Sequence, residues 1–246
     1  MFSFFTRRRE RFTQTDYGFL GLDLHSHLIP GIDDGVPDTE TALACLRKLK
    51  EMGYRKVITT PHIIQDLHPN TSEGIRRGLA QLQKAVDAEK LDLVVEAAAE
   101  YLLDDHFMNL LRNDDVLTLG QNLLLFELPF AIPPLNLEAL VFQMMTRGYQ
   151  PILAHPERYG YLHAHPERLK SLKDQGCFFQ VNMLSLAGQY GSRIQQFARK
   201  LIDQNQVEFL GSDMHRLRDA EKMEQLLKSK ELAVLGGREF LNASLL

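Results

Sequence analysis

The alternation of short apolar runs with longer helical segments is the feature that most constrains this fold. From residue 20 onward, runs rich in Val, Ile, Leu and Phe are separated by stretches of helical periodicity. This pattern is typical of a mainly parallel β-sheet in an α/β fold. The predicted strands are Leu20–Leu24, Lys56–Thr60, Leu91–Ala97, Leu123–Leu128, Pro151–Ala154, Cys177–Val181 and Val207–Gly211. Seven such units favour a closed or nearly closed parallel barrel, because closure removes sheet edges, with an open doubly wound sheet as the alternative.

Several helix boundaries can also be predicted. Asp38 can cap a helix that ends at Gly53, and Asn136 can cap another that ends at Gly148. Pro166 can open a third helix, because proline suits the first helical turn. These helices are expected to serve as scaffold.

Residues 1–19 differ in composition from the rest of the chain. Three phenylalanines, at positions 2, 4 and 5, precede four arginines, at positions 7–9 and 11. Such a leader could make weak contact with an anionic membrane surface, and a frayed terminus is the alternative interpretation. No linker or charge block divides residues 20–246, so we expect one domain there.

Composition excludes several classes of protein. The chain has 28 basic and 32 acidic side chains and a formal net charge of −4, which argues against nucleic-acid binding. Two cysteines in 246 residues, Cys45 and Cys177, do not make a disulfide framework. No apolar run approaches the roughly 20 residues of a membrane span, and no secretory signal is evident. We therefore expect a cytoplasmic protein.

Histidines and carboxylates gather where the predicted strands end. Strand ends in parallel α/β folds share one face of the sheet, so these side chains are expected to meet there. Five of the nine histidines and four carboxylates are the candidates: His25, His27, one of the adjacent pair Asp33 and Asp34, His62, Glu100, Glu127, His155, Asp213 and His215. Asp33 and Asp34 point to opposite sides if their segment is extended, so one of them is expected to coordinate and the other to support the loop.

The spacing and residue types of this set predict metal binding. His25 and His27 are two residues apart, so in an extended segment they point to the same side. Glu127 lies in an apolar strand, where a charged carboxylate needs a cation or hydrogen-bond donors to neutralise it. Imidazole and carboxylate ligands without cysteine suit Mn²⁺, Fe or catalytic Zn²⁺. Nine ligands are too many for one ion and fit three, which points to hydrolysis of a phosphate ester.

The motifs resemble a known family. They are His25-Ser26-His27, Gly31-Ile32-Asp33-Asp34-Gly35, Thr60-Pro61-His62, Ala154-His155-Pro156-Glu157-Arg158-Tyr159 and Gly211-Ser212-Asp213-Met214-His215. Together they are similar to those of the polymerase and histidinol phosphatase (PHP) superfamily. Within it, they resemble the bacterial manganese-dependent protein tyrosine phosphatases of capsular and exopolysaccharide synthesis. The resemblance covers roughly residues 20 to 240.

This resemblance implies a distorted seven-stranded (β/α) barrel that holds three metal ions, with Mn²⁺ as the expected metal. The implied ligands are His25, His27, Glu100 and Asp213 for the first ion; Glu100, Glu127 and His155 for the second; and Asp34, His62 and His215 for the third. The implied partner is a phosphotyrosine protein, namely a membrane tyrosine autokinase.

Three further side chains are predicted to act on the substrate. The resemblance implies that Arg158 binds the phosphate, because its planar guanidinium can donate two parallel hydrogen bonds. Arg216 and Arg218 compete for a second phosphate contact, and we favour Arg218. A phenolate leaving group needs little acid assistance, and His68 or a water molecule could supply it.

Two other functions compete with tyrosine dephosphorylation. The same cluster would serve a small-molecule phosphatase such as histidinol-phosphate phosphatase, and a metal-binding regulatory module would keep the ligands without turnover. The cysteine-dependent tyrosine phosphatases are excluded, because they need an arginine six residues after the cysteine. Glu51 follows Cys45 at that spacing, and Met183 follows Cys177.

Overall fold

The computed structural model describes residues 16–229 except 121, together with 232, 235 and 237–246. Its strands are β1 (Leu22–Asp23), β2 (Lys56–Thr59), β3 (His62–Ile63), β4 (Val94–Ala97), β5 (Glu100–Leu102), β6 (Leu123–Glu127), β7 (Gln150–Ala154), β8 (Phe178–Asn182) and β9 (Phe209–Gly211). Its α-helices are α1 (Thr39–Glu51), α2 (Ser72–Ala88), α3 (Asp105–Arg112), α4 (Leu137–Thr146), α5 (Gly160–Ala164), α6 (Pro166–Asp174), α7 (Met183–Leu186), α8 (Ser192–Asp203) and α9 (Leu217–Leu227). Two 3₁₀-helices are η1 (Pro156–Arg158) and η3 (Leu241–Leu245).

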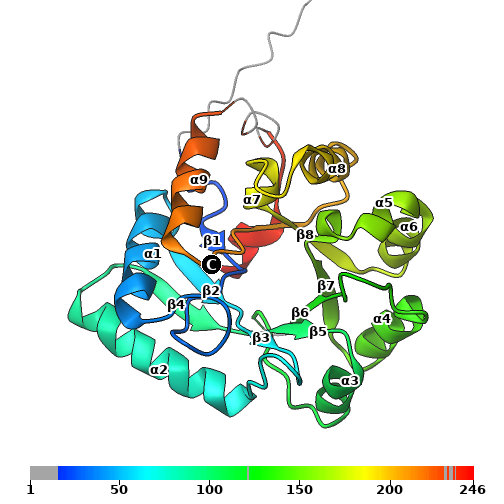
Figure 1. The fold of residues 1–246 in the computed structure, drawn as a ribbon, viewed down its shortest axis with the longest axis horizontal. Helices are drawn as coiled ribbons and strands as arrows, with labels where there is room; N and C mark the ends of the chain where they lie inside the picture. Colours follow the sequence, from blue (N-terminus) through cyan, green and yellow to red (C-terminus); the bar gives the residue numbers. More distant parts are fainter. Residues whose placement is uncertain (1–15, 121, 230–231, 233–234, 236) are drawn as a thin grey trace, which may run out of the picture.

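The strands form two parallel sheets, and the helices surround them (Figure 1). One sheet has the order β1-β2-β4, and the other has the order β3-β5-β6-β7-β8-β9. The predicted α/β class and parallel pairing are confirmed. The predicted closed or nearly closed seven-stranded barrel is not shown, since no single sheet joins all the described strands.

The division arises because the predicted strands Lys56–Thr60 and Leu91–Ala97 are each followed by a second short strand that was not predicted. The run after Lys56 is interrupted at Thr60 and Pro61, so that β2 lies in one sheet and β3 in the other. Pro61 has no N–H to donate, which is a reason for a ladder to stop there. The next run breaks at residues 98–99 between β4 and β5. Each break moves the chain from the first sheet to the second.

The first and last strands meet without a continuous ladder. Beyond their carboxyl ends, Ser26 forms an isolated parallel bridge with Met214. The Asp213 N–H donates to the His25 carbonyl at 2.8 Å, and the His27 N–H donates to the Met214 carbonyl at 2.9 Å. The two sheets are thus connected at the end where the predicted ligands lie.

The line of contact between β1 and β9 is called the seam here. At its other end, the side chain of Asn242 lies between the two strands. Its Nδ2 donates to the carbonyls of Leu22 and Leu210 at 3.0 and 2.7 Å, and its Oδ1 accepts from the Leu210 N–H at 3.1 Å. Asn242 is fully buried. One amide from η3 therefore satisfies backbone groups that a strand partner would otherwise satisfy.

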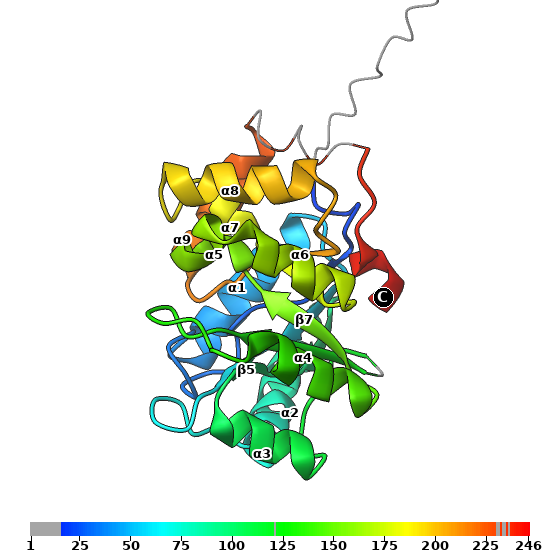
Figure 2. The same ribbon diagram turned by 90° about the vertical axis from the view of Figure 1, so that its right-hand side faces the viewer.

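The predicted helix starts are confirmed, except for one capping bond. Asp38 accepts from the Thr41 N–H at 2.8 Å at the start of α1, as predicted. Asn136 precedes α4 but makes no side-chain capping bond, so that part of the prediction is wrong. Pro166 is the first residue of α6, as predicted. Figure 2 shows α4 and α6 stacked on one side of the molecule, alongside β7.

The predicted leader falls mostly outside the described residues, since residues 1–15 are not described. Tyr17 is fully buried, and its hydroxyl donates to the Met223 carbonyl at 2.8 Å. Tyr17, which was predicted to belong to the leader, therefore packs with the domain. Among the described residues, none of the helices has the length and apolar character needed to cross a bilayer.

Candidate metal centre

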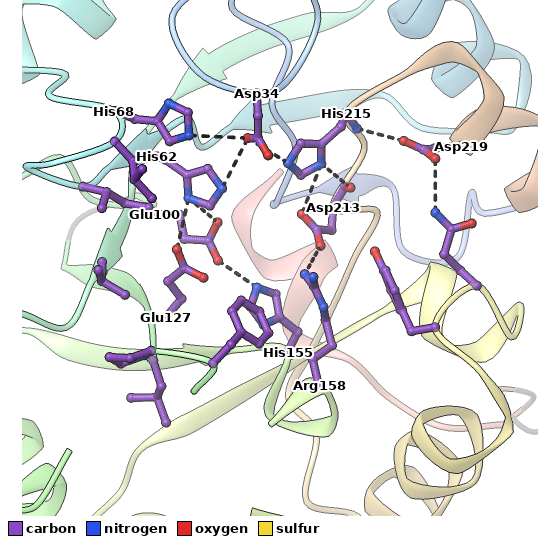
Figure 3. Close-up of a pocket in the computed structure, with 18 of the residues that line it drawn as sticks. Asp34, His62, His68, Glu100, Glu127, His155, Arg158, Asp213, His215 and Asp219 are labelled. Carbon is purple, nitrogen blue, oxygen red and sulfur yellow. Dashed lines mark hydrogen bonds and ion pairs between the residues drawn. The ribbon is translucent and has the colours of Figure 1, made fainter. Parts of the chain in front are cut away.

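The nine predicted ligands come together at the carboxyl ends of the strands. Seven of them line one pocket with a volume of about 480 Å³: Asp34, His62, Glu100, Glu127, His155, Asp213 and His215. Figure 3 shows those that line the pocket. His25 and His27 are completely buried next to these residues. The set therefore converges although its members span almost 200 positions of sequence.

The ligand atoms form four overlapping groups within which all the atoms lie within 4.8 Å of one another. The groups are His27, Asp34, His62 and His215; His25, Glu100 and His155; His25, His27 and Asp213; and His62, Glu100 and Glu127. This clustering is the geometry that several adjacent cations require. His62 belongs to two groups, whereas the resemblance assigned it to the third ion alone.

Glu100 lies at the centre of the cluster. Its Oε2 is 3.1 Å from His25 Nε2 and 3.2 Å from His62 Nδ1, and its Oε1 is 2.9 Å from His155 Nε2. Burial alone would raise the pKa of Glu100, but His25 and His62 outweigh it and hold the pKa well below its usual value. A carboxylate with both oxygens engaged in this way is suited to bridge two cations.

Glu127 ends β6 and is buried, and its Oε1 lies 3.2 Å from His62 Nδ1. Although this distance is short, His62 Nδ1 has no hydrogen bond of acceptable geometry in the described structure. Buried polar atoms without partners are unusual in proteins. Because a cation between imidazole and carboxylate would satisfy such atoms, the donor set fits bound divalent metal ions.

The adjacent carboxylates Asp33 and Asp34 point in different directions, as predicted. Asp34 Oδ1 lies 3.4 Å from His215 Nε2 and 3.6 Å from His62 Nε2, inside the cluster. Asp33 Oδ2 instead lies 2.8 Å from His27 Nδ1 and accepts from the His62 N–H at 3.1 Å. Asp33 therefore holds the His27 ring from behind, which is the usual role of a carboxylate next to a metal-binding histidine.

Two of the cluster residues have strained backbone conformations. His155 has φ of 35° and Asp213 has φ of 51°, both in the left-handed region. Non-glycine residues adopt this region at a cost of about 1–3 kcal/mol, and such residues concentrate at functional sites. In both cases the turn directs a side chain from the end of a strand into the pocket.

Histidine protonation in the cluster reflects its dense negative charge. Burial alone lowers the pKa of His25, but Glu100 and Asp213 outweigh it and raise the pKa to about 9. The pKa of Asp213 is held well below its usual range: burial opposes this shift, and His25 is its principal cause. The carboxylates therefore attract positive charge strongly, whether from protons or from metal ions.

Arg158 enters the pocket from η1. Its Nη1 donates to Asp213 Oδ2 at 2.9 Å, and its Cζ lies 4.8 Å and 4.5 Å from the ring centroids of Phe130 and Tyr190. One N–H of the guanidinium is thereby engaged, while the side chain also faces the pocket. This arrangement leaves N–H groups for an anion.

The other predicted substrate residues lie at the pocket rim. Arg216 and Arg218 are both exposed and both line the pocket, so their positions do not separate them. His68 also lines it, with Nε2 4.0 Å from Asp34 Oδ1 and its ring stacked on that of His62 at 5.5 Å.

Several residues of the site were not predicted from the sequence. Phe130 and Tyr190 flank Arg158, and Asp219 accepts from the N–H groups of His215 and Arg216 at 3.1 and 3.0 Å. The other two, Gln180 and Asn182, are fully buried polar residues on β8. The sequence feature that identified Glu127, a polar side chain inside an apolar strand, could also have identified Gln180 and Asn182.

Comparison with known proteins gives a consistent picture. The model of the family described as capsular polysaccharide synthesis, CpsB/CapC, matches residues 21–232. Tyrosine-protein phosphatase YwqE of Bacillus subtilis is 30% identical over 198 residues, which are 80% of this chain and 78% of the relative. Tyrosine-protein phosphatase CpsB of Streptococcus pneumoniae is 25% identical over 202 residues, 80% of this chain and 83% of that protein.

Solved structures agree with these relatives. A crystal structure described among those of YwqE from Bacillus subtilis and CpsB from Streptococcus pneumoniae, metal-dependent tyrosine phosphatases, superposes with a TM-score of 0.75 at 27% identity, covering 89% of this chain and 96% of the other. Histidinol phosphate phosphatase from Lactococcus lactis shares the fold, with a TM-score of 0.54 at 14% identity over 89% of this chain and 95% of that one. Because the family model spans most of the sequence, this chain belongs to the CpsB/CapC family of capsular polysaccharide synthesis.

Proposed function

We propose that this protein is a metal-dependent phosphatase that hydrolyses phosphotyrosine in proteins. The observation that carries the proposal is the convergence of five imidazoles, four carboxylates and Arg158 at one pocket. Cys45 and Cys177 are both buried, so neither offers a nucleophile to a protein substrate. The relatives from Bacillus subtilis and Streptococcus pneumoniae are both named tyrosine-protein phosphatases, which supports the same activity.

The proposed cofactor is Mn²⁺, bound as three ions by the nine ligands, and Fe or Zn²⁺ would fit the same donor types. When bound, such ions would generate a nucleophile from water near neutral pH and neutralise charge on the phosphoryl group. The protein contributes the arrangement of ligands. Asp33 and the Asp213 carbonyl each contact the Nδ1 atom of a ligand histidine, so that Nε2 of His27 and of His215 faces the cluster.

Binding of the phosphate is assigned to Arg158. Its guanidinium is oriented by Asp213 and by two aromatic rings, so its free N–H groups can contact two phosphoryl oxygens. A second contact is proposed for Arg218 at the rim. His68, beside Asp34, is proposed to donate a proton to the leaving tyrosinate. Phe130 is half-exposed in the pocket and offers an apolar surface to the tyrosine ring.

The proposed substrate is the phosphorylated tail of a membrane tyrosine autokinase of capsule synthesis. Its support is membership of a family described by capsular polysaccharide synthesis, together with a pocket that opens at the molecular surface. Contact of residues 1–15 with a membrane remains part of this proposal and lies outside the described residues.

The test compares turnover before and after metal removal. We expect chelation to abolish hydrolysis of p-nitrophenyl phosphate and of a phosphotyrosine peptide, and Mn²⁺ to restore both. Histidinol phosphate and a phosphoserine peptide serve as comparison substrates. A kcat/KM for histidinol phosphate above that for the phosphotyrosine peptide would replace this proposal with a small-molecule phosphatase. Metal binding without turnover of any substrate would indicate a regulatory module.

A further inference from the structure

Strand β8 supplies no histidine or carboxylate to the cluster, yet two amide side chains occupy its carboxyl-terminal half. Gln180 and Asn182 are two residues apart, and both are fully buried. Alternate residues of a strand share a face, so both side chains lie on the same side of the sheet. Burial of two amides is costly unless their polar atoms are paired.

The two amides connect two candidate metal ligands through an unbroken series of contacts. His25 Nδ1 lies 2.8 Å from Gln180 Oε1, and Gln180 Nε2 lies 2.8 Å from Asn182 Oδ1. Asn182 Nδ2 in turn lies 2.6 Å from Asp213 Oδ2. The series thus runs from the ligand after β1, across β8, to the ligand after β9.

The chemistry of the Asp213 end fixes the direction of every hydrogen bond. An ionised carboxylate oxygen only accepts, so Asn182 must present its NH₂ group to Asp213 and its carbonyl to Gln180. Gln180 must then donate through Nε2, which leaves its Oε1 to accept from His25. Turning either amide over would set oxygen against oxygen or NH₂ against NH₂. His25 therefore carries its proton on Nδ1.

The opposite nitrogen of the same ring faces the cluster. His25 Nε2 lies 3.1 Å from Glu100 Oε2 and 3.4 Å from Asp213 Oδ1. The other oxygen of Asp213 is occupied by Asn182 and by Arg158 Nη1. The same series thus leaves one atom of His25 and one of Asp213 directed at a common point.

We propose that Gln180 and Asn182 are positioning residues: an amide relay that fixes the His25 tautomer and the Asp213 orientation for metal binding. This inference rests on the proposed metal centre but is independent of the substrate. Other ligand histidines are fixed by different groups, His27 by the Asp33 carboxylate and His215 by a backbone carbonyl. Partners of this kind typically change metal affinity 10- to 100-fold when they are lost.

Gly211 on β9 makes room for the relay. A Cβ atom at this position would lie 2.7 Å from the His25 Cβ and 2.8 Å from Gln180 Nε2. Real Cβ atoms do not approach other atoms so closely. The glycine therefore allows the first residue of the relay and its histidine to pack against the strand.

The test measures Mn²⁺ binding to the full chain after metal removal, by titration against a competing chelator. We expect Gln180→Met and Asn182→Leu to weaken binding of the most affected ion about 10- to 100-fold. The matched control is Asn242→Leu, which removes a buried asparagine with three hydrogen bonds at the far end of the β1–β9 seam. It should lower the melting temperature without changing Mn²⁺ affinity.

A second measurement, which does not depend on activity, distinguishes the contact between His25 and Gln180 from the contact between Gln180 and Asn182. In the Zn²⁺-loaded protein, ¹⁵N NMR of the imidazoles should show a protonated Nδ1 at His25. Gln180→Glu keeps the acceptor for that proton and removes the donor to Asn182. We therefore expect the His25 signal to persist in Gln180→Glu and to broaden by exchange in Gln180→Met.

Specific outcomes would overturn the inference. The inference is wrong if the Mn²⁺ affinity of both Gln180→Met and Asn182→Leu stays within about twofold of wild type. It is also wrong if Asn242→Leu loses as much Mn²⁺ affinity as these two variants. A His25 ring protonated on Nε2 in the Zn²⁺-loaded wild type would also reject it. If the wild type binds Mn²⁺ as expected but leaves phosphotyrosine intact, the proposed function fails and the relay stands.

Discussion

At the scale of single residues, the two carboxylate oxygens of Asp213 contact different groups. Its Oδ1 faces His25 and His27, both at 3.4 Å, whereas its Oδ2 accepts from Arg158 and Asn182. The first oxygen is directed at the candidate metal positions and the second toward the groups that orient it. Loss of this carboxylate would therefore affect the metal ligands and the phosphate contact together.

The tetrapeptide His-Pro-Glu-Arg occurs twice, at residues 155–158 and 165–168, and allows a matched test of the ligands. We expect His155→Ala to lower kcat for p-nitrophenyl phosphate at least about a hundredfold, because a lost ligand misplaces the metal ions and the attacking water. Asp213→Ala should have a similar effect. His165→Ala is the control, since the second copy starts α6 with its histidine exposed. Near-normal kcat in both ligand variants would reject the assigned centre.

Arg158 allows a test of phosphate recognition. Lysine at this position retains the charge but loses the planar pair of donors, so we expect Arg158→Lys mainly to raise KM with the fold intact. Steady-state kinetics with a phosphotyrosine peptide measures this change. Arg216→Ala and Arg218→Ala, assayed in parallel, identify the second phosphate contact by the larger rise in KM. Unchanged KM and kcat in Arg158→Lys would remove its proposed role.

How far the site could be predicted depends on the kind of residue. His62 and Glu127 could be predicted because a charged or metal-ligating side chain at the end of an apolar strand is costly there unless it binds something. Gln180 and Asn182 are equally central, but a neutral amide in a strand has several ordinary uses, and the contact with Asp213 depends on tertiary packing. Phe130 is an apolar residue in a loop, so nothing local distinguished it from an exposed aromatic.

At the scale of secondary structure, most strand positions and their parallel direction were predictable, but the division of the strands into two sheets was not. Apolar runs located β6, β7 and β8 within a few residues. The breaks that separate β2 from β3 and β4 from β5 depend on how neighbouring segments pair, which no local pattern contains. Consequently the parallel α/β class could be inferred, while the division into two sheets could not.

Packing of β9 against β8 gives a prediction at this scale. Gly211→Ala introduces a Cβ that would overlap the His25 Cβ and Gln180 Nε2, so β9 or the relay must shift. We expect a loss of about 1–3 kcal/mol in the free energy of unfolding, together with weaker Mn²⁺ binding. Denaturant unfolding and metal titration measure the two effects. Gly160→Ala is the control, because a Cβ there meets nothing within 4 Å.

At the scale of the whole molecule, the described part of the chain has one hydrophobic core and keeps its reactive groups at one end of the strands. Both cysteines belong to that core rather than to the pocket. Burial raises the pKa of each thiol to about 12, because the thiolate is poorly solvated there. The chemistry of the pocket is therefore separate from thiol chemistry.

This separation predicts that the enzyme resists thiol reagents. At pH 8 both thiols of the folded protein stay protonated, so we expect slow reaction with a disulfide reagent until denaturant is added. The double variant Cys45→Ala/Cys177→Ala should retain kcat for p-nitrophenyl phosphate within a few-fold while losing stability. The absorbance of the thiolate released from the disulfide reagent measures the reaction of the cysteines, and the kinetic assay measures kcat of the double variant. Rapid inactivation of the folded wild type by alkylation would contradict the assignment.

The position of Asn242 also bears on what the segment after β9 contributes to the fold. The seam between the first and last strands receives its far closing contacts from a side chain some thirty residues beyond β9. Without Asn242, the carbonyls of Leu22 and Leu210 and the N–H of Leu210 would lack these partners. The far end of the seam is therefore complete only when β1, β9 and η3 have all come together, so that truncation before residue 242 would leave polar backbone groups exposed between the two strands.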